Sequence, residues 1–376
     1  MNKFANNQIP LLLDGHMLDS LLKNIPADFD GNIVERVEGC RICNEQTGKL
    51  IANVDYWDIK STRIIQCLKC RLMQLDPMLT TDETANGCLA YYIEETLRVG
   101  KADQVKNNVR NFRRGVLFAY SLKKIKSEIR DVLELGPGSG YFADGMKFII
   151  PDLKITVLDI NKELLSFNKE HHGFEGIEAI PDDFVSQYQN CFDLVIARDI
   201  IEHVADISSV VKNVNKYLRP GGLFHFTTPN GHEDVWKHYL LAKNKNVASE
   251  LLINHVNYFD GKGLKEFLIE AGFKPEKYYT YEIKSTMKGY GWKNSVALMS
   301  AVSRKLKADY FIKERAGEIV NINYDKEEIL DRWYISKNNK WLTVFYSWYQ
   351  HSPLIRLSPD LKVGHEIYGL FRKINQ

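Results

Sequence analysis

The sequence predicts an α/β fold in which a doubly wound, mostly parallel sheet follows a small N-terminal metal-binding module. Strand-like apolar runs alternate with helical patterns after residue 130, a loop with three alternate glycines follows the first run, and two C-x2-C pairs stand near the N-terminus. A chain of 376 residues is too long for one typical domain. We expect an N-terminal module at 1–100, the sheet domain at 101–284, a helical insertion at 285–358 and a last strand of the sheet at 359–376.

The composition narrows the function classes. Fifty Lys and Arg residues against 48 Asp and Glu residues give a net charge of +2, which makes nucleic acid an unlikely partner. The N-terminus holds only a short leucine run without a cleavage pattern, and no apolar stretch approaches the roughly 20 residues that span a bilayer. The sequence therefore predicts a cytoplasmic protein.

Four of the six cysteines form two pairs with the same internal spacing. In a reducing compartment this pattern favours a tetrahedral zinc site, because two thiolates on each of two tight turns can converge on one ion. Two unrelated buried or redox-active pairs are the alternative. All four ligand positions would be filled, so the zinc is expected to be structural. The expected ligands are Cys40, Cys43, Cys67 and Cys70.

The elements of the sheet domain follow from periodicity and turn residues. A Lys- and Arg-rich helical stretch covers about residues 101 to 130, and strands then alternate with helices, which is typical of a parallel doubly wound sheet. Strands are expected at Asp131–Leu135, Lys154–Asp159, Gly176–Ile180, Phe192–Ala197 and Leu223–Thr227, and helices at Tyr141–Phe148, Lys162–Lys169 and Ile207–Tyr217.

The loop Gly136-Pro137-Gly138-Ser139-Gly140 joins the first strand to its helix. A dinucleotide fingerprint would need glycine at position 141, which is Tyr141, and the Gly-Lys-Ser/Thr ending of a P-loop is absent. The second strand ends in Asp159, a position at which a carboxylate can accept two ribose hydroxyls. The pattern therefore predicts a nucleoside-bearing ligand that is held without a phosphate cradle.

From residue 130 to about 285 the chain resembles class I S-adenosylmethionine-dependent methyltransferases. The resemblance implies a seven-stranded Rossmann-like methyltransferase sheet and S-adenosylmethionine as the methyl donor. It places Glu134 beside the donor's ammonium or the loop amides, the glycines against its sugar and amino-acid parts, Asp182 near the adenine, and Arg198 near the methionine part. Asp183 competes with Asp182 for its role. The implied donor-binding residues are Glu134, Gly136, Gly138, Gly140, Asp159, Asp182 and Arg198.

The cysteine module carries a second, narrower resemblance. Its last pair opens the stretch C-x2-C-R-L-M-Q-L-D-P, and a Tyr-Tyr pair follows at 91–92, as in zinc-ribbon-bearing bacterial methyltransferases of cell-surface polysaccharides and modified sugars. This resemblance implies O-methylation of a saccharide or glycan hydroxyl and a role in polysaccharide biosynthesis. Deoxysugar C-methyltransferases share such a module but carry a second Rossmann-like domain, and no alternating pattern follows residue 285 here.

An O-methyltransferase must hold an oxygen nucleophile in line with the methyl group and remove its proton with a base or a metal. His203 and His255 are the candidate bases. His203 lies at the exit of the fourth strand and His255 just before a predicted helix, and the resemblance implies that both places border the donor's methyl group. Asp199-x-x-Glu202-His203 with the later His255 resembles the metal-binding set of small-RNA 3′-terminal 2′-O-methyltransferases and, in part, of ubiquinone-biosynthesis O-methyltransferases. It implies a second, divalent metal such as Mg, Mn, Fe or Zn. A bound metal, a simple histidine base and a structural Glu202–His203 pair all remain open.

The sequence also bears on other functions and partners. An RNA methyltransferase would need a basic module, yet basic and acidic residues balance across residues 31–60. A non-catalytic binding module that kept the fold is another alternative, and the intact donor loop argues against it. Between residues 284 and 307 the insertion carries basic residues and no acid, with apolar residues at helical spacing. It is expected either to cover the acceptor site or to rest, as a peripheral helix, on an anionic membrane surface.

Overall fold

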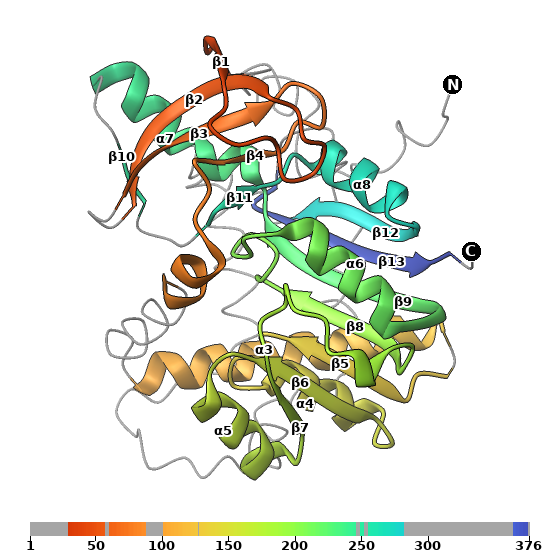
Figure 1. The fold of residues 1–376 in the computed structure, drawn as a ribbon. Helices are drawn as coiled ribbons and strands as arrows, with labels where there is room; N and C mark the ends of the chain where they lie inside the picture. Colours follow the sequence, from red (N-terminus) through yellow and green to blue (C-terminus); the bar gives the residue numbers. More distant parts are fainter. Residues whose placement is uncertain are drawn as a thin grey trace, which may run out of the picture.

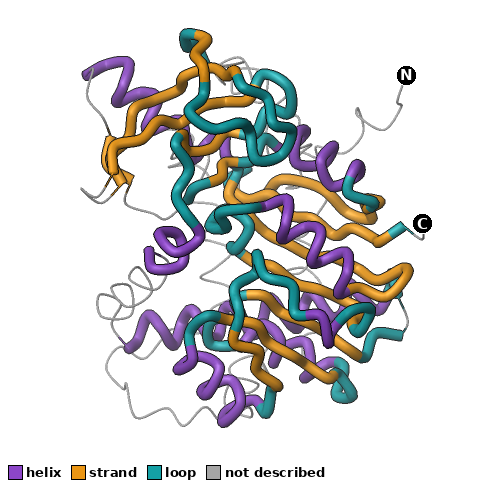
Figure 2. The backbone as a smooth tube through the Cα atoms, viewed as in Figure 1, coloured by secondary structure: helices purple, strands orange, loops and turns teal. Residues whose placement is uncertain are grey.

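The computed structural model describes residues 29–56, 60–87, 101–126, 128–245, 249–251, 255–281 and 364–374. Two sheets organise this part of the chain: a mainly N-terminal sheet in the upper part of the view and a seven-stranded sheet below it (Figure 1). Figure 2 shows the helices that flank the strands of the larger sheet. The expected insertion at 285–358 lies outside the described residues.

The larger sheet confirms the predicted fold class. Its strand order is β12-β13-β9-β8-β5-β6-β7, and the strands from β5 to β9 run parallel to one another. Strand β13, from the C-terminal end, lies antiparallel between β9 and β12. The strands are β5 (Asp131–Leu135), β6 (Lys154–Asp159), β7 (Glu175–Glu178), β8 (Phe192–Arg198), β9 (Leu218–Pro229), β12 (Phe273–Tyr281) and β13 (Glu366–Lys373).

Helices cover both faces of this sheet, so its central strands are buried on both sides and read as nearly continuous apolar runs. Leu133 and Val195 pack on one face with residues of α6 and α8, whereas Val132 and Leu194 pack on the other face with residues of α3 and α4. The helices are α3 (Lys101–Lys123), α4 (Tyr141–Ile149), α5 (Lys162–His172), α6 (Ile207–Tyr217) and α8 (Gly261–Glu270).

The smaller sheet has the order β1-β2-β3-β4-β11, and β10 pairs in parallel with β2. Its first four strands come from the predicted N-terminal module, but β10 and β11 come from the connection between β9 and α8. The same connection supplies α7, which packs on this sheet (Figure 1). The elements are β1 (Ile33–Glu35), β2 (Thr47–Tyr56), β3 (Lys60–Cys67), β4 (Met73–Asp76), α7 (Gly231–Lys245), β10 (Ser249–Leu251) and β11 (Asn257–Tyr258).

The expected boundary at residue 100 therefore does not separate the two sheets. Val235 and Tyr239 of α7 share a buried apolar cluster with Val54, Ile64 and Met73 of the N-terminal strands. The core of the smaller sheet thus needs residues from both parts of the chain. Within the described ranges no helix combines the length and the apolarity that crossing a bilayer requires.

Candidate active site

The glycine loop after β5 adopts a backbone that favours glycine throughout. Gly136, Gly138 and Gly140 have φ angles of 57°, 54° and 73°, in the left-handed region. A Cβ added to Gly140 would lie 1.9 Å from Oδ1 of Asn168, whose Nδ2 donates a hydrogen bond of 2.9 Å to the carbonyl of Gly138. Asn168 of α5 therefore holds the loop in place. A Cβ added to Gly138, in contrast, would meet no atom within 4 Å.

The predicted donor-binding side chains lie along one edge of the sheet. Leu135 at the end of β5 pairs with Leu158 of β6 and with Ala197 of β8, so Glu134, Asp159 and Arg198 reach the same carboxyl-terminal edge. This edge, where β5 and its neighbours end, is where ligands of doubly wound sheets bind.

Asp159 and Asp182 are two partly buried carboxylates on this edge. The Asn161 backbone N–H donates to Oδ1 of Asp159 at 2.8 Å, and the Asp206 N–H donates to Oδ1 of Asp182 at 2.8 Å. Burial raises the pKa of both carboxyl groups above their usual range. Each side chain keeps a second oxygen that can accept hydrogen bonds from a ligand's hydroxyl or amino groups.

Glu134 is the most deeply buried carboxylate of the donor edge. It is 2% exposed, and its Oε2 has no hydrogen-bond partner within the described part of the chain. Burial raises the pKa of its carboxyl group to about 8, against the lowering effect of the Arg198 guanidinium. An unpaired buried acid of this kind is costly, and a cationic ligand group would offset that cost. The donor edge therefore fits S-adenosylmethionine, which carries an ammonium and a sulfonium.

Arg198 is held by residues of two helices. Its guanidinium carbon lies 4.2 Å from the centre of the Phe142 ring, and Nη2 donates to Oδ1 of Asn111 at 3.3 Å. Phe142 belongs to α4 and Asn111 to α3, so both helices orient the cation at the end of β8.

Glu202 lies in the loop that leaves β8, and it is 1% exposed. Its Oε2 accepts a hydrogen bond of 2.9 Å from the Thr228 hydroxyl, whereas Oε1 lacks a hydrogen-bond partner among the described residues. Burial, and then the nearby Asp199 carboxylate, raise the pKa of Glu202 well above its usual range. A proton or a cation at Oε1 is needed to stabilise this carboxyl group.

The structure brings three of the four expected acceptor-side residues together. Ligand atoms of Glu202, His203 and His255 all lie within 4.8 Å of one another, and the centroids of the two imidazole rings are 4.9 Å apart. Asp199 is not part of this group, and its Oδ1 accepts a hydrogen bond of 3.1 Å from the Thr227 hydroxyl. Asp199 has a φ of 54°, and the residues from Ile201 to His203 form a turn and not a helix.

Asp234, in the first turn of α7, is a site residue that the sequence did not indicate. Its Oδ2 lies 2.6 Å from Nδ1 of His255, 21 positions away along the chain. Because a carboxylate can only accept, Nδ1 carries the proton, and Nε2 of the neutral ring can then accept one. No local pattern links the two residues, since their contact depends on where α7 meets the segment before β11.

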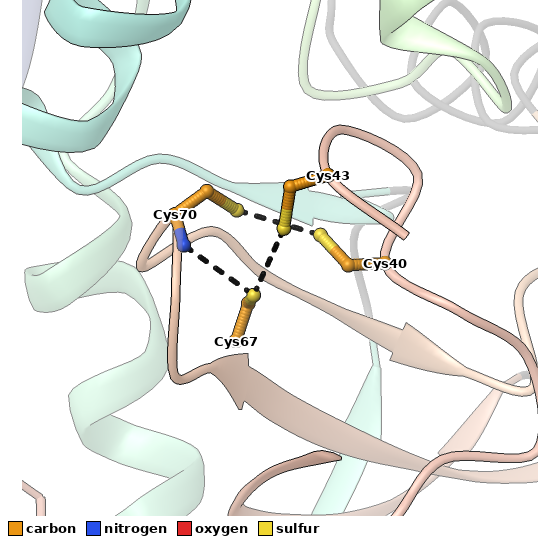
Figure 3. A group of neighbouring side chains, drawn as sticks. All are labelled: Cys40, Cys43, Cys67 and Cys70. Carbon is orange, nitrogen blue, oxygen red and sulfur yellow. Dashed lines mark hydrogen bonds between the residues drawn. The ribbon is translucent and has the colours of Figure 1, made fainter. Parts of the chain in front are cut away.

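The four paired cysteines form a compact cluster (Figure 3). All four sulfur atoms lie within 4.8 Å of one another, with Cys40 Sγ 3.4 Å from Cys70 Sγ and Cys43 Sγ 3.4 Å from Cys67 Sγ. Tetrahedral zinc with Zn–S bonds of about 2.3 Å requires sulfur separations of about 3.8 Å, close to these distances. The hydrogen bond to Cys67 raises the pKa of Cys40 to about 11, so the cluster needs a cation to hold four thiolates.

The two cysteine turns share one geometry. The N–H of Asn44 donates to the carbonyl of Cys40 at 2.8 Å, and the N–H of Arg71 donates to the carbonyl of Cys67 at 3.2 Å. Asn44 and Arg71 each follow the second cysteine of a pair, and both have positive φ angles, 58° and 67°. This repeated turn directs both thiols of each pair to the same point, so the cluster fits a closed zinc site.

The sheet domain is similar to known methyltransferase domains. The family model described as "Methyltransferase domain" matches residues 92–278. Among curated relatives, the ubiquinone biosynthesis O-methyltransferase of Proteus mirabilis is 29% identical over 132 residues, 34% of this chain and 51% of that protein. The enzyme of the same name from Vibrio atlanticus is 31% identical over 118 residues, 30% of this chain and 48% of that protein.

The chain therefore spans about half the length of the curated relatives it matches. Among solved structures, the YcgJ protein of Bacillus subtilis aligns with 69% of this chain and 99% of its own, at 13% identity and a TM-score of 0.36.

Proposed function

Since this chain carries a class I S-adenosylmethionine-dependent methyltransferase domain, we propose that it transfers the donor's methyl group to a hydroxyl oxygen. We propose further that the acceptor is a hydroxyl of a saccharide or glycan, which the resemblance of the cysteine module implies. The observation that carries the O-methyltransferase proposal is the Asp234–His255 pair, which lies beside Glu202 and His203 next to the donor edge.

His255 acts as the general base in this proposal. Bound S-adenosylmethionine supplies an activated methyl group. The acceptor oxygen forms a bond to the methyl carbon while the carbon–sulfur bond breaks, and the hydroxyl proton passes to Nε2 of His255. Asp234 holds Nδ1–H and stabilises the imidazolium that forms. The positive charge lost from the sulfonium reappears on the imidazolium of His255, and S-adenosylhomocysteine leaves with a neutral thioether.

A divalent cation is a second way to activate the hydroxyl, and one observation favours it. Oε1 of Glu202 has no hydrogen-bond partner in the described residues, and Nε2 of His203 lies 4.0 Å from it, with His255 in the same group. A carboxylate and two imidazoles would suit Mg, Mn, Fe or Zn, which would lower the acceptor's pKa. Turnover after chelation that spares the cysteine site separates the two mechanisms: an unchanged rate, with no gain from Mg or Mn, removes the metal.

A panel of acceptors tests the function. Purified protein with S-adenosylmethionine is incubated with methyl α-D-glucopyranoside, UDP-glucose or 3,4-dihydroxybenzoate, and S-adenosylhomocysteine and methylated product are measured by mass spectrometry. The aromatic diol is included because the curated relatives are named for ubiquinone biosynthesis. Methylation of a saccharide probe supports the proposal. Methylation of the diol alone would replace the acceptor class, and absence of donor binding by calorimetry would overturn the enzyme proposal itself.

A further inference from the structure

The segment from His255 to Asp260 joins the acceptor site to the cysteine module. It contains β11, whose Asn257 and Tyr258 pair antiparallel with Gln74 and Met73 of β4. The N–H of Leu75 in β4 also donates to the carbonyl of Val256 at 3.2 Å. The residues that follow His255 are thus an edge of the smaller sheet.

The same segment forms hydrogen bonds to the loop that carries Glu202 and His203. The N–H groups of Val256 and Asn257 both donate to the carbonyl of Glu202, at 2.9 and 3.1 Å. The side-chain Nδ2 of Asn257 donates to the carbonyl of Val204 at 2.7 Å and to that of Ile201 at 3.3 Å. Val256 and Asn257 are almost fully buried, so these bonds are shielded from water and fix the loop tightly.

The second cysteine turn holds the other end of the segment. The guanidinium of Arg71, which directly follows Cys70, forms two parallel bonds to Asp260, Nε to Oδ1 and Nη2 to Oδ2, both at 3.3 Å. Asp260 also caps α8 by accepting from the N–H of Gly263. A Cβ on Gly263 would lie 2.4 Å from the carbonyl oxygen of Cys70, so the helix end packs directly against this turn.

We infer that the cysteine centre is a positioning device for the acceptor site, with Arg71 and Asn257 as its positioning residues. The Cys67–Cys70 turn, labelled in Figure 3, fixes Arg71 and β4, and these fix His255 to Asp260 and through Asn257 the Glu202 loop. Metal bound by the four thiolates therefore sets where His255 and Glu202 lie, although none of the cysteines belongs to the acceptor group. The inference rests on the proposed function only in giving His255 and Glu202 a catalytic role.

The test is hydrogen exchange in the full-length, zinc-loaded protein, with Arg71→Gln and Arg41→Gln as a matched pair. Arg41 follows Cys40, and its half-exposed side chain pairs with the nearby Glu38, so its loss leaves the segment untouched. In Arg71→Gln, with zinc content unchanged, amides of residues 255–260 and 200–204 exchange about tenfold faster, the factor that loss of a charge-assisted hydrogen bond corresponds to. Amides of the donor edge, 131–140, and the affinity for S-adenosylhomocysteine stay as in the wild type.

Chelation of the zinc in the wild-type protein should produce the same local increase in amide exchange. In Arg71→Gln, kcat for the accepted hydroxyl probe should fall about tenfold, while the KM for the donor stays unchanged. If Arg71→Gln exchanges like Arg41→Gln, the inference is overturned. Faster exchange that extends to the donor edge also overturns the inference, because it would indicate that the substitution destabilises the whole protein and not only this segment. Exchange is measured without any acceptor, so a protein that methylates none of the probes fails the proposed function and leaves this result interpretable.

Discussion

In the proposed mechanism, proton removal depends most directly on Asp234 and His255. Replacing His255 with Gln removes the base, and we expect kcat to fall by about 10² to 10³, the usual contribution of general-base catalysis. Asp234→Asn keeps the side-chain volume but no longer stabilises the imidazolium, so a smaller loss of about tenfold or more is expected. His171→Gln, at an exposed histidine of α5, is the control. Steady-state kinetics on the accepted probe decide; equal losses in all three variants would contradict the assignment.

Glu134 gives a prediction about pH. Because burial raises its pKa to about 8 from the usual 4.5, the folded state holds this proton more tightly than the unfolded state does. The donor-free protein should therefore lose stability as pH rises from about 4.5 to 8. Glu134→Gln stays neutral, so its melting temperature should exceed that of the wild type increasingly between pH 5 and pH 8, while its affinity for S-adenosylmethionine falls. A constant difference in melting temperature across this range would show that Glu134 is not the titrating group.

The residues of the site differ in how far the sequence could predict them. Glu134, Asp159 and Arg198 follow a strand-and-loop order, so their shared edge could be expected from the parallel pattern. Asp234 could not be predicted, because its contact with His255 depends on the path of a long connection. Asp199 lies outside the group formed by Glu202, His203 and His255, and its positive φ angle is a local feature that the sequence pattern did not predict.

The helices and strands also differ in how far the sequence could predict them. The bounds of β5, β6 and α6 match the expected ranges, because continuous apolar runs or a clear helical period end at turn residues. β10 and β11 were not expected, since strands of three and two residues carry no periodic signal. Their pairing with the N-terminal strands depends on tertiary packing, since α7 and β11 contribute residues to the same buried apolar cluster as those strands.

The proposed zinc site gives a prediction for the two cysteine turns. We expect about one zinc per purified chain, and Cys67→Ser should reduce this content towards zero because a closed four-thiolate site tolerates the loss of no ligand. The smaller sheet should then melt earlier, while the donor edge retains its affinity for S-adenosylhomocysteine. Cys191→Ser, outside the cluster, serves as the control. Metal analysis by mass spectrometry tests this, and zinc-free protein made under reducing conditions with unaltered melting would refute it.

At the scale of the whole molecule, the smaller sheet is built from two separate parts of the chain, because β10 and β11 follow β9 of the larger sheet. Removing residues 1–100 would uncover Val235, Tyr239, Val256 and Tyr258, which are buried against the N-terminal strands. An exposed apolar patch of this kind favours aggregation, so the truncated chain is expected to be insoluble or to elute as aggregates in size-exclusion chromatography. A monodisperse truncated protein with wild-type donor affinity would show instead that the larger sheet folds independently.

The pairing of β12 with β13 bears on the chain between them. Tyr281, the last residue of β12, pairs with Glu366, the first of β13, and their side chains form a hydrogen bond. The polypeptide thus leaves the sheet and re-enters it at adjacent points, as in a β-hairpin whose turn has been replaced by a longer passage. Loop-closure entropy grows only slowly with length, so the sheet accepts passages of very different size at this position. The connection between β12 and β13 can therefore change in length and sequence without loss of the strand pairing that completes the sheet.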